Sequence, residues 1–386
     1  MKASIVPVTC KNLDVVADVI KRFGFPRSER WIKRLLFDPN VPEGRDLDSR
    51  GALIMSDGGE CVGVYCWTPC SVYLRQERKS AYIGALLGVD RKYSPWMLDV
   101  IDRNRTEING RFAFGNDCAT VAAYKFWTRL GVEWGPEECG CLDSWFASTG
   151  GFLYLCANHV FRRMHLTVGD RLMRLIHTAC RLPNYFVELF MRAWDSVRGD
   201  LGLYGNWRYR EELGFAEERF RAFWERFLAA NEGVISSRDP ATLRWKFNDS
   251  IMAGTVTLIS AESNGAVDGY ILLRRYESES TSEVEYSVCD ICAVGNDVKC
   301  LHDLFCIALR YCRRRMATRL TFVGGMHGKE KWMPRLFHRR IKLACNAFSY
   351  SAKDEAMIRA VREDKGWFFG PYDGERCMGY GRYVDL

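Results

Sequence analysis

One carboxylate interrupts an otherwise apolar stretch of this sequence. Asp290 stands in the run SVCDICAV, whose composition is typical of a buried strand. A buried carboxylate is costly unless it is paired, and an unpaired one readily takes up a proton, as a general base must. Asp290 could equally lie on the open side of its strand and bond to a neighbouring backbone group or arginine. The sequence leaves both roles open, a catalytic base or a structural partner.

Cysteine and histidine are the other residue types that could do chemistry here. The closely spaced cysteine pairs are Cys139 with Cys141 and Cys289 with Cys292. A structural zinc site needs four ligands, and side chains three apart on a strand point to opposite faces. The six histidines form no HxxxH or HxH set, and no Ser–His–Asp arrangement, Walker loop or dinucleotide fingerprint is present. We therefore predict no metal site and reduced thiols that pack as small hydrophobic groups.

The elements that must position these residues begin with an alternation of helix-like and strand-like periods in residues 1–150. The run Asp57-Gly58-Gly59 is a hairpin signal between two strands, and Gly131 suits the end of a helix. The predicted elements, in chain order, are a helical region at 12–37, strands at 52–56, 61–74 and 80–89, a helix at 96–103, a strand at 111–114 and a helix at 119–130.

The same order returns after residue 213. Its predicted elements are a helix at 215–229, strands at 255–261, 267–274 and 284–294, a helix at 298–314, a strand at 319–323, a helix at 331–343 and a strand at 347–351. The helix at 331–343 would carry a basic cluster from Arg335 to Lys342, which we interpret as a solvated face. This internal repeat predicts an α+β fold of two units, 1–150 and 214–386, each with a mixed, mostly antiparallel sheet flanked by helices.

Residues 151–213 have a different composition, rich in Leu, Phe, Arg and His, with little strand pattern. We predict a helical connector that is broken near Pro183. Two interpretations stay open for its apolar and basic residues. The helices either pack between the two units, or they present a basic amphipathic face to a membrane or an anionic substrate.

Composition limits the class of protein. The chain has 386 residues, of which 48% are hydrophobic and 27% charged, as in globular proteins and unlike disordered or fibrous ones. The net charge of +7 is mild for this length, so it permits anionic partners without requiring one, and we expect no DNA partner. We see neither a stretch of about 18 apolar residues nor a secretory leader, and therefore expect a cytoplasmic protein without a transmembrane segment. The oligomeric state stays open.

Three segments together resemble the GNAT fold, that of the GCN5-related acyl-CoA N-acyltransferases. The stretch ECVGVYCW followed by LLGVDRKYS resembles the third and fourth strands of that family. The run WTRLGV at 127–132 is similar to the end of its late helix. In the second half, RDPATLRWKF at 238–247 resembles a segment of tandem GNAT-like proteins encoded among bacterial polysaccharide and envelope genes. The resemblance covers most of the chain except the connector, and it implies two GNAT-like domains.

The resemblance implies an acyltransferase that uses acetyl-CoA or another acyl-CoA. The acceptor would be an envelope sugar, a polysaccharide precursor or another small molecule. The residues implied in cofactor binding, in or beside the family's loop and fifth strand, are Val89, Arg91, Tyr93, Met97 and Asn116. The family often has its acid, a tyrosine, where Trp127 stands here, so Tyr124, one turn earlier, is the candidate acid and Asp290 the candidate base.

The loops also depart from the family pattern. After Tyr93 the expected glycines are missing, and Pro95 has no N–H to offer a phosphate. In the second half, Asp297 and Asp303 lie near a helix start, where carboxylates suit caps but repel pyrophosphate. Two other functions therefore stay open: transfer from aminoacyl-tRNA, as in peptidoglycan bridge enzymes, and a non-catalytic binding module.

Overall fold

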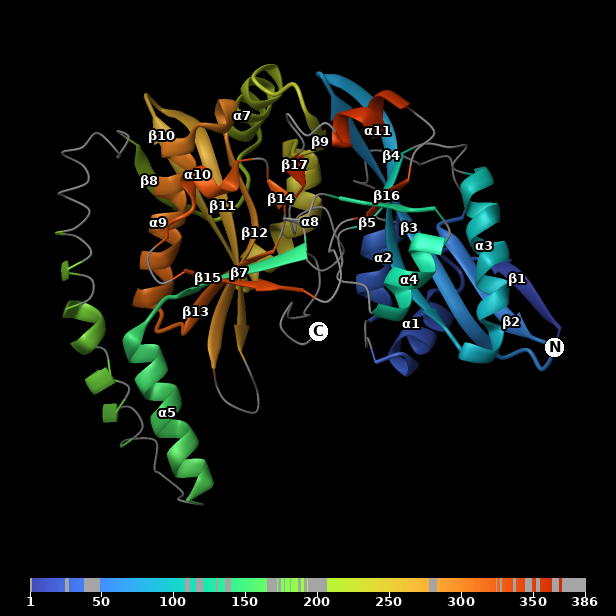
Figure 1. Ribbon diagram of the computed structural model, residues 1–386, viewed down its shortest axis with the longest axis horizontal. Helices are drawn as coiled ribbons and strands as arrows, with labels where there is room; N and C mark the ends of the chain where they lie inside the picture. The colour runs from blue at the N-terminus through green and yellow to red at the C-terminus, as the bar shows by residue number, and fades with distance from the viewer. Residues whose placement is uncertain are drawn as a thin grey trace.

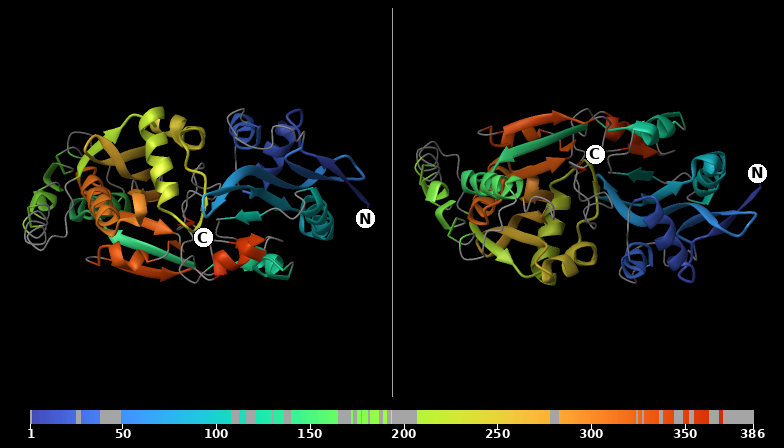
Figure 2. Two further views of the ribbon diagram at one scale, coloured as in Figure 1. Left: turned by 90° about the horizontal axis from the view of Figure 1, so that it is seen from above. Right: turned by 90° about the horizontal axis from the view of Figure 1, so that it is seen from below.

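The computed structural model shows two α+β units side by side (Figure 1 and Figure 2). It describes residues 2–24, 28–37, 49–107, 112–115, 121–129, 131–135, 140–164, parts of 172–193, 207–277, 283–323, 325–326, 328–335, 338–343, 349–351, 355–362 and 368–369. Among the described helices, none is long and apolar enough to cross a membrane. Each unit contains a mixed, mostly antiparallel sheet with helices packed against it, as the sequence predicted.

The first unit builds its sheet from consecutive strands. The strands β1 (Ala3–Pro7), β2 (Gly51–Ser56), β3 (Cys61–Leu74) and β4 (Glu77–Val89) pair antiparallel in that order, and β5 (Phe112–Gly115) pairs parallel to β4. The remaining elements are α1 (Leu13–Arg22), α2 (Glu29–Phe37), the short helix η1 (Arg91–Tyr93), α3 (Ser94–Glu107), α4 (Val121–Arg129), β6 (Glu133–Trp134) and β7 (Cys141–Phe146). The three predicted central strands are confirmed.

The second unit repeats this plan. The strands β8 (Arg208–Glu212), β10 (Val256–Ser263), β11 (Ala266–Glu277) and β12 (Val284–Ala293) pair antiparallel, and β13 (Arg319–Val323) pairs parallel to β12. The other elements are α7 (Glu217–Ala229), β9 (Val234–Ser236), α8 (Pro240–Met252), η3 (Val294–Asn296), α9 (Val298–Arg314), β14 (Gly325–Met326), α10 (Lys329–Trp332), β15 (His338–Lys342), β16 (Ser349–Ser351), α11 (Glu355–Arg362) and β17 (Phe368–Phe369). The connector begins with α5 (Thr149–Arg163).

A β-bulge marks the same place in both units. In β4 the extra residue is Leu86, which has a positive φ of 49°. In β12 the register shifts at Cys289. Each bulge lies seven residues before the end of the short helix that follows, Tyr93 in one unit and Asn296 in the other. A bulge bends its strand and is typically a retained feature, so the shared spacing supports the internal repeat.

The two units exchange one strand each. The strand β7, which belongs to the first unit by sequence, pairs with β13 and β15 in the second sheet. The strand β16, from the second half of the chain, pairs with β5 and β6 in the first sheet. In Figure 1 the green β7 lies among orange strands, and the red α11 lies over the blue sheet. A third link is β9, which pairs with the end of β3, and one hydrophobic core cluster contains residues of both units.

The predicted helix at 331–343 is wrong. The chain forms the short helix α10, leaves it at Met333 in an extended conformation with ψ of 131°, and then enters the strand β15. Pro334 explains the break, because the residue before a proline disfavours the helical region. The basic residues of 338–342 therefore lie on a strand that pairs with β7.

Candidate functional site

Each sheet forks where its two parallel strands stop pairing. In the first unit, Ala81–Ile83 of β4 pair with 112–114 of β5, and the described pairing of these strands ends there. The rest of β4 runs on to Val89, and α3 follows one short turn later. In the second unit, 285–287 of β12 pair with 319–321 of β13 before the described pairing ends. A fork that leads to a helix N-terminus is the feature of each unit that could admit a ligand, because the helix offers backbone N–H groups there.

The structure brings four of the predicted cofactor residues together at the first fork. Val89 ends β4, Arg91 and Tyr93 form the short turn η1, and Met97 lies in the first turn of α3. The side chains of Tyr93 and Met97 are buried in a hydrophobic cluster with β2 and β3, so they shape the turn. Arg91 is exposed. Asn116 lies outside the described residues.

The helix that follows the fork differs between the two units. The helix α9 is capped by Asp297, whose carboxylate accepts hydrogen bonds from the backbone N–H groups of Lys299 at 2.8 Å and Cys300 at 3.0 Å. The capping role predicted for Asp297 is thus confirmed. The matching residue at the start of α3 is Ser94, whose hydroxyl donates to the carbonyl of Arg91 at 2.9 Å, and the first turn of α3 contains no acidic residue. A carboxylate fills the anion position in the second unit only.

The candidate acid Tyr124 lies on α4, with its ring stacked on Trp134 at 4.3 Å between centroids. Trp127, one turn later, faces β3, with its ring 5.9 Å from that of Tyr65. It also packs against the cluster that contains Val89. The indole therefore borders the first fork, whereas the Tyr124 ring packs beside β6. The acid role of Tyr124 stays a prediction.

The candidate base Asp290 lies in a buried ion pair. Arg238 Nε lies 3.0 Å from Asp290 Oδ2, a second guanidinium nitrogen lies 3.1 Å from Oδ1, and the Tyr270 hydroxyl donates to Oδ2 at 2.6 Å. Both charged side chains are almost fully buried. Arg238 also donates to the carbonyl and hydroxyl of Ser236. This is the geometry of the structural alternative, because both carboxylate oxygens accept bonds from the protein.

A second buried carboxylate, Asp143, organises the exchanged strand β7. It lies 3.0 Å from Lys329 Nζ, 2.8 Å from His338 Nε2 and 2.7 Å from Arg340 Nε. Burial raises the pKa of the Asp143 carboxyl, but the hydrogen bond from Arg340 and the charge of Lys329 outweigh it, and the pKa falls below its ordinary value. His338 also stacks on Trp145 at 4.8 Å. Two members of the predicted solvated basic cluster, His338 and Arg340, are thus structural partners of Asp143.

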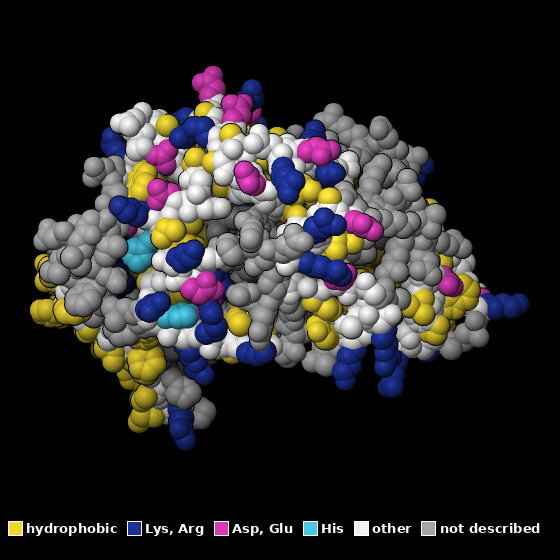
Figure 3. All heavy atoms as spheres, turned by 45° about the horizontal axis from the view of Figure 1, so that its top comes forward, with side chains coloured by type: hydrophobic (Ala, Val, Ile, Leu, Met, Phe, Trp, Pro, Cys, Tyr) yellow, Lys and Arg dark blue, Asp and Glu magenta, His cyan; other side chains and the backbone are white. Residues whose placement is uncertain are grey.

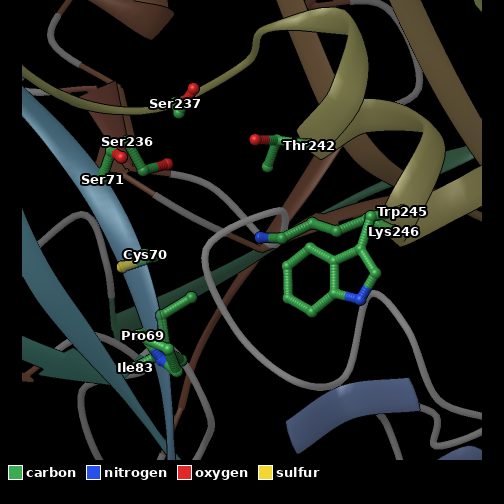
Figure 4. A pocket seen from close by; sticks show the side chains of 9 residues that line it. All are labelled: Pro69, Cys70, Ser71, Ile83, Ser236, Ser237, Thr242, Trp245 and Lys246. Atoms are coloured by element: carbon green, nitrogen blue, oxygen red, sulfur yellow. The ribbon is translucent and has the colours of Figure 1, made fainter. Parts of the chain in front are cut away.

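A pocket lies at the seam between the units, where α8 and the turn after β9 face β3 and β4 (Figure 4). The empty space between its lining atoms, with the adjoining open solvent included, is about 280 Å³. Lys246 extends from α8 into it, and the ring of Trp245 forms part of the wall. The lining residues are Pro69, Cys70, Ser71, Ile83, Ser236, Ser237, Thr242, Trp245 and Lys246. Ile83 is also the last residue of β4 that pairs with β5, so the pocket adjoins the first fork.

The RDPATLRWKF segment supplies one wall of this pocket, and sequence reasoning missed its helix. Asp239 caps α8 by accepting from the Thr242 N–H at 2.9 Å, and Pro240 occupies the first turn. An acidic residue followed by proline is a helix-start signal that could have been used. The helix turns Trp245 and Lys246 toward the first unit, where the Trp245 indole N–H donates to the Arg34 carbonyl at 3.0 Å.

Three solved structures that resemble this chain are named as N-acetyltransferases or as a probable N-acyltransferase. A GCN5-related N-acetyltransferase from Anabaena variabilis matches with a TM-score of 0.51 at 11% identity, over 90% of this chain and 72% of that one. A conserved Enterococcus faecalis protein of unknown function, a probable N-acyltransferase, matches with a TM-score of 0.53 at 10% identity, over 91% and 73%. A Kribbella flavida GCN5-related N-acetyltransferase matches at 0.50 and 15% identity, over 93% and 73%. The chain has the GNAT fold.

No protein-family model matches the sequence, and no curated protein sequence matches it. The likeness to the solved structures is therefore a likeness of fold. At 10–15% identity it does not carry over a substrate or a residue role.

Proposed function

We propose that this protein transfers an acyl group from acetyl-CoA or another acyl-CoA to a small acceptor, and that the first unit holds the donor. The observation that carries the proposal is the contrast between the two forks. The first turns of both helices lack acidic residues, but Asp297 caps α9 with a carboxylate, whereas the matching position at the start of α3 is held by the uncharged Ser94. The carboxylate of Asp297 would repel an anionic pyrophosphate at α9, whereas the positive end of the α3 dipole would attract one.

Different residues of the first fork would bind different parts of the acyl-CoA donor. Backbone N–H groups at the start of α3, including that of Met97, would donate hydrogen bonds to the phosphate oxygens. The exposed Arg91 and its neighbour Lys92 would add positive charge, while Val89 and Tyr93 fix the turn by packing. Acyl-CoA would supply the activated acyl group. From Val89 back to Ile83 the strand β4 spans roughly 20 Å at about 3.3 Å per residue, which connects the turn to the seam pocket.

The seam pocket is the proposed acceptor site. Its lining combines three serine hydroxyls with the amine of Lys246 and an aromatic wall, Trp245. Hydroxyl and ammonium groups beside an aromatic face suit an acceptor rich in hydroxyls, such as a saccharide precursor. Such a hydroxyl or amine acceptor must lose a proton and the leaving thiolate must gain one. Tyr124 stays the predicted acid, whereas the buried ion pair of Asp290 with Arg238 supports its structural role over the predicted role of base.

A charge swap between the two units tests the donor site. Ser94→Asp places a carboxylate at the position in the first unit that Asp297 occupies in the second. We expect wild-type protein to bind acetyl-CoA or CoA in isothermal titration, and Ser94→Asp to bind at least tenfold more weakly. The matched control, Asp297→Ala, should lose about 1 kcal/mol of stability through the missing cap and keep its affinity. No binding by wild-type protein, or loss only in Asp297→Ala, would overturn the proposal.

A further inference from the structure

The connector forms an arm whose hydrophobic side chains face solvent. We define the arm as α5, Met164 and the helical residues that the structure describes between 172 and 193. Six of its large hydrophobic side chains are between 61% and 68% exposed: Met164, Leu175, Leu182, Tyr185, Phe186 and Phe190. Elsewhere among the described residues, only Leu213 and Met252 reach such exposure. Figure 1 shows α5 projecting from the second unit, and Figure 3 shows hydrophobic side chains gathered at the same margin.

The arm is attached to the protein by a buried polar anchor. The Asn184 side chain is 8% exposed, accepts from the Gly150 N–H at 2.7 Å and donates to the Ser148 hydroxyl at 2.7 Å. It also lies 3.3 Å from the carbonyl of Arg313 at the end of α9. Gly150 is required here, because a Cβ would lie 1.9 Å from the Cys180 carbonyl oxygen. The exposed residues that follow Asn184 are therefore held in a defined place.

The charge of the arm indicates what would cover it. Between residues 149 and 193 the sequence has six arginines, no lysine and only two carboxylates, Asp170 and Glu188. The side chain of Arg163, at the end of α5, is exposed. Exposed Leu, Phe and Tyr side chains in a segment whose sequence is rich in arginine are typical of interfacial amphipathic helices, which insert hydrophobic groups between anionic lipid headgroups. We propose that the arm binds the surface of an anionic lipid bilayer.

Two other partners fit the arm less well. A second copy of the chain, related by a two-fold axis, would bring one basic arm against another, and the charges would repel. A nucleic acid would pair with the arginines but would leave the leucine and phenylalanine side chains without an apolar contact. The proposal is independent of acyl-CoA binding, since no residue of the arm belongs to the forks or the seam pocket.

Vesicle cosedimentation tests the proposal with the full chain. We expect binding to vesicles that contain phosphatidylglycerol, weaker binding to pure phosphatidylcholine, and a decline as salt rises. Phe186→Ser combined with Phe190→Ser should reduce the bound fraction at least fivefold, and Arg163→Glu should reduce it on phosphatidylglycerol vesicles. Met252→Ser, which removes an equally exposed hydrophobic side chain outside the arm, is the matched control and should bind like wild-type protein.

Three results would overturn the proposal. The first is that wild-type protein does not sediment with phosphatidylglycerol vesicles. The second is that Met252→Ser reduces the bound fraction as much as the Phe186→Ser and Phe190→Ser double variant does. The third is a dimer in analytical ultracentrifugation that the Phe186→Ser and Phe190→Ser changes dissociate, without any vesicle binding by wild-type protein. Unchanged circular dichroism and melting temperature of the double variant would show that any loss of binding comes from the exposed surface.

Discussion

At the scale of single residues, two buried carboxylates lie in ion pairs inside the second unit. Asp290 pairs with Arg238, and Asp143 contacts Lys329 and His338. Removing one partner of a buried pair leaves an uncompensated charge, which costs much more than the pair itself contributes. The two sites therefore give stability predictions with a clear sign.

Arg238→Met should destabilise the protein by about 3–5 kcal/mol in urea unfolding, because it leaves Asp290 charged and buried. The double change Arg238→Met with Asp290→Leu should recover most of that loss. The control Arg221→Met, at an exposed ion pair with Glu217, should leave stability nearly unchanged, because solvent screens an exposed pair. An Arg238→Met single variant as stable as wild-type protein would contradict the stabilising role of the buried pair.

Asp290→Asn distinguishes the two roles considered for Asp290. If Asp290 is a base, the variant should lose turnover while its melting temperature stays unchanged. If Asp290 is a structural partner, the variant should lose stability.

Asp143→Asn should show a pH-dependent loss of stability. The lowered pKa of Asp143 means that its ionised form stabilises the fold above the ordinary carboxyl pKa of about 4, and that this contribution is lost as pH falls through the lowered value. We expect a loss of about 3–5 kcal/mol at pH 7, since Lys329 stays buried. The difference from wild-type protein should shrink below pH 4. A difference that is constant with pH would exclude the ionised pair as its source.

The residue scale also shows where sequence reasoning ends. The apolar run around Asp290 correctly predicted a buried carboxylate, and its composition suggested an arginine partner only as one alternative. Arg238 lies 52 positions away, and the contact forms because the short segment between β9 and α8 lies beside β12. A local pattern gives the burial of a side chain, whereas its partner depends on how distant elements pack.

At the scale of elements, the exchange of β7 and β16 makes each sheet depend on the other half of the chain. The exchanged strand β16 is fixed by Tyr350, whose hydroxyl donates to Glu133 of β6 at 2.9 Å. Burial, together with that hydrogen bond, raises the pKa of Tyr350 to about 12. Arg362 of α11 bonds the same carboxylate. The central strands of both units were predictable from alternation and turn signals, but the exchange was not, because pairing between distant strands leaves no local pattern.

Fragments that divide the chain in the connector should not fold alone. A fragment of residues 1–164 lacks β16, and one of residues 207–386 lacks β7, so each leaves unpaired strand edges. We expect each fragment alone to aggregate or to show little cooperative melting. Co-expressed fragments should copurify and melt cooperatively. Independent, cooperative unfolding of either fragment would contradict the exchanged arrangement.

At the scale of the whole molecule, the two units share a plan but differ at the position where an anion would bind. The repeat of elements was predictable from the sequence, and so was the capping role of Asp297. The seam pocket was not predictable, because it forms only when α8 of the second unit lies against β3 and β4 of the first. The account therefore depends on one asymmetry, an anion position that is open in the first unit and filled by a carboxylate in the second.

Hydrogen–deuterium exchange of the full chain with and without CoA tests that asymmetry most directly. The account predicts slower exchange in peptides that cover the end of β4 and the start of α3, residues 86–98, and no change in the matching peptides that cover residues 289–301 of the second unit. Slower exchange only at residues 289–301, or no change in either region at saturating CoA, would contradict it.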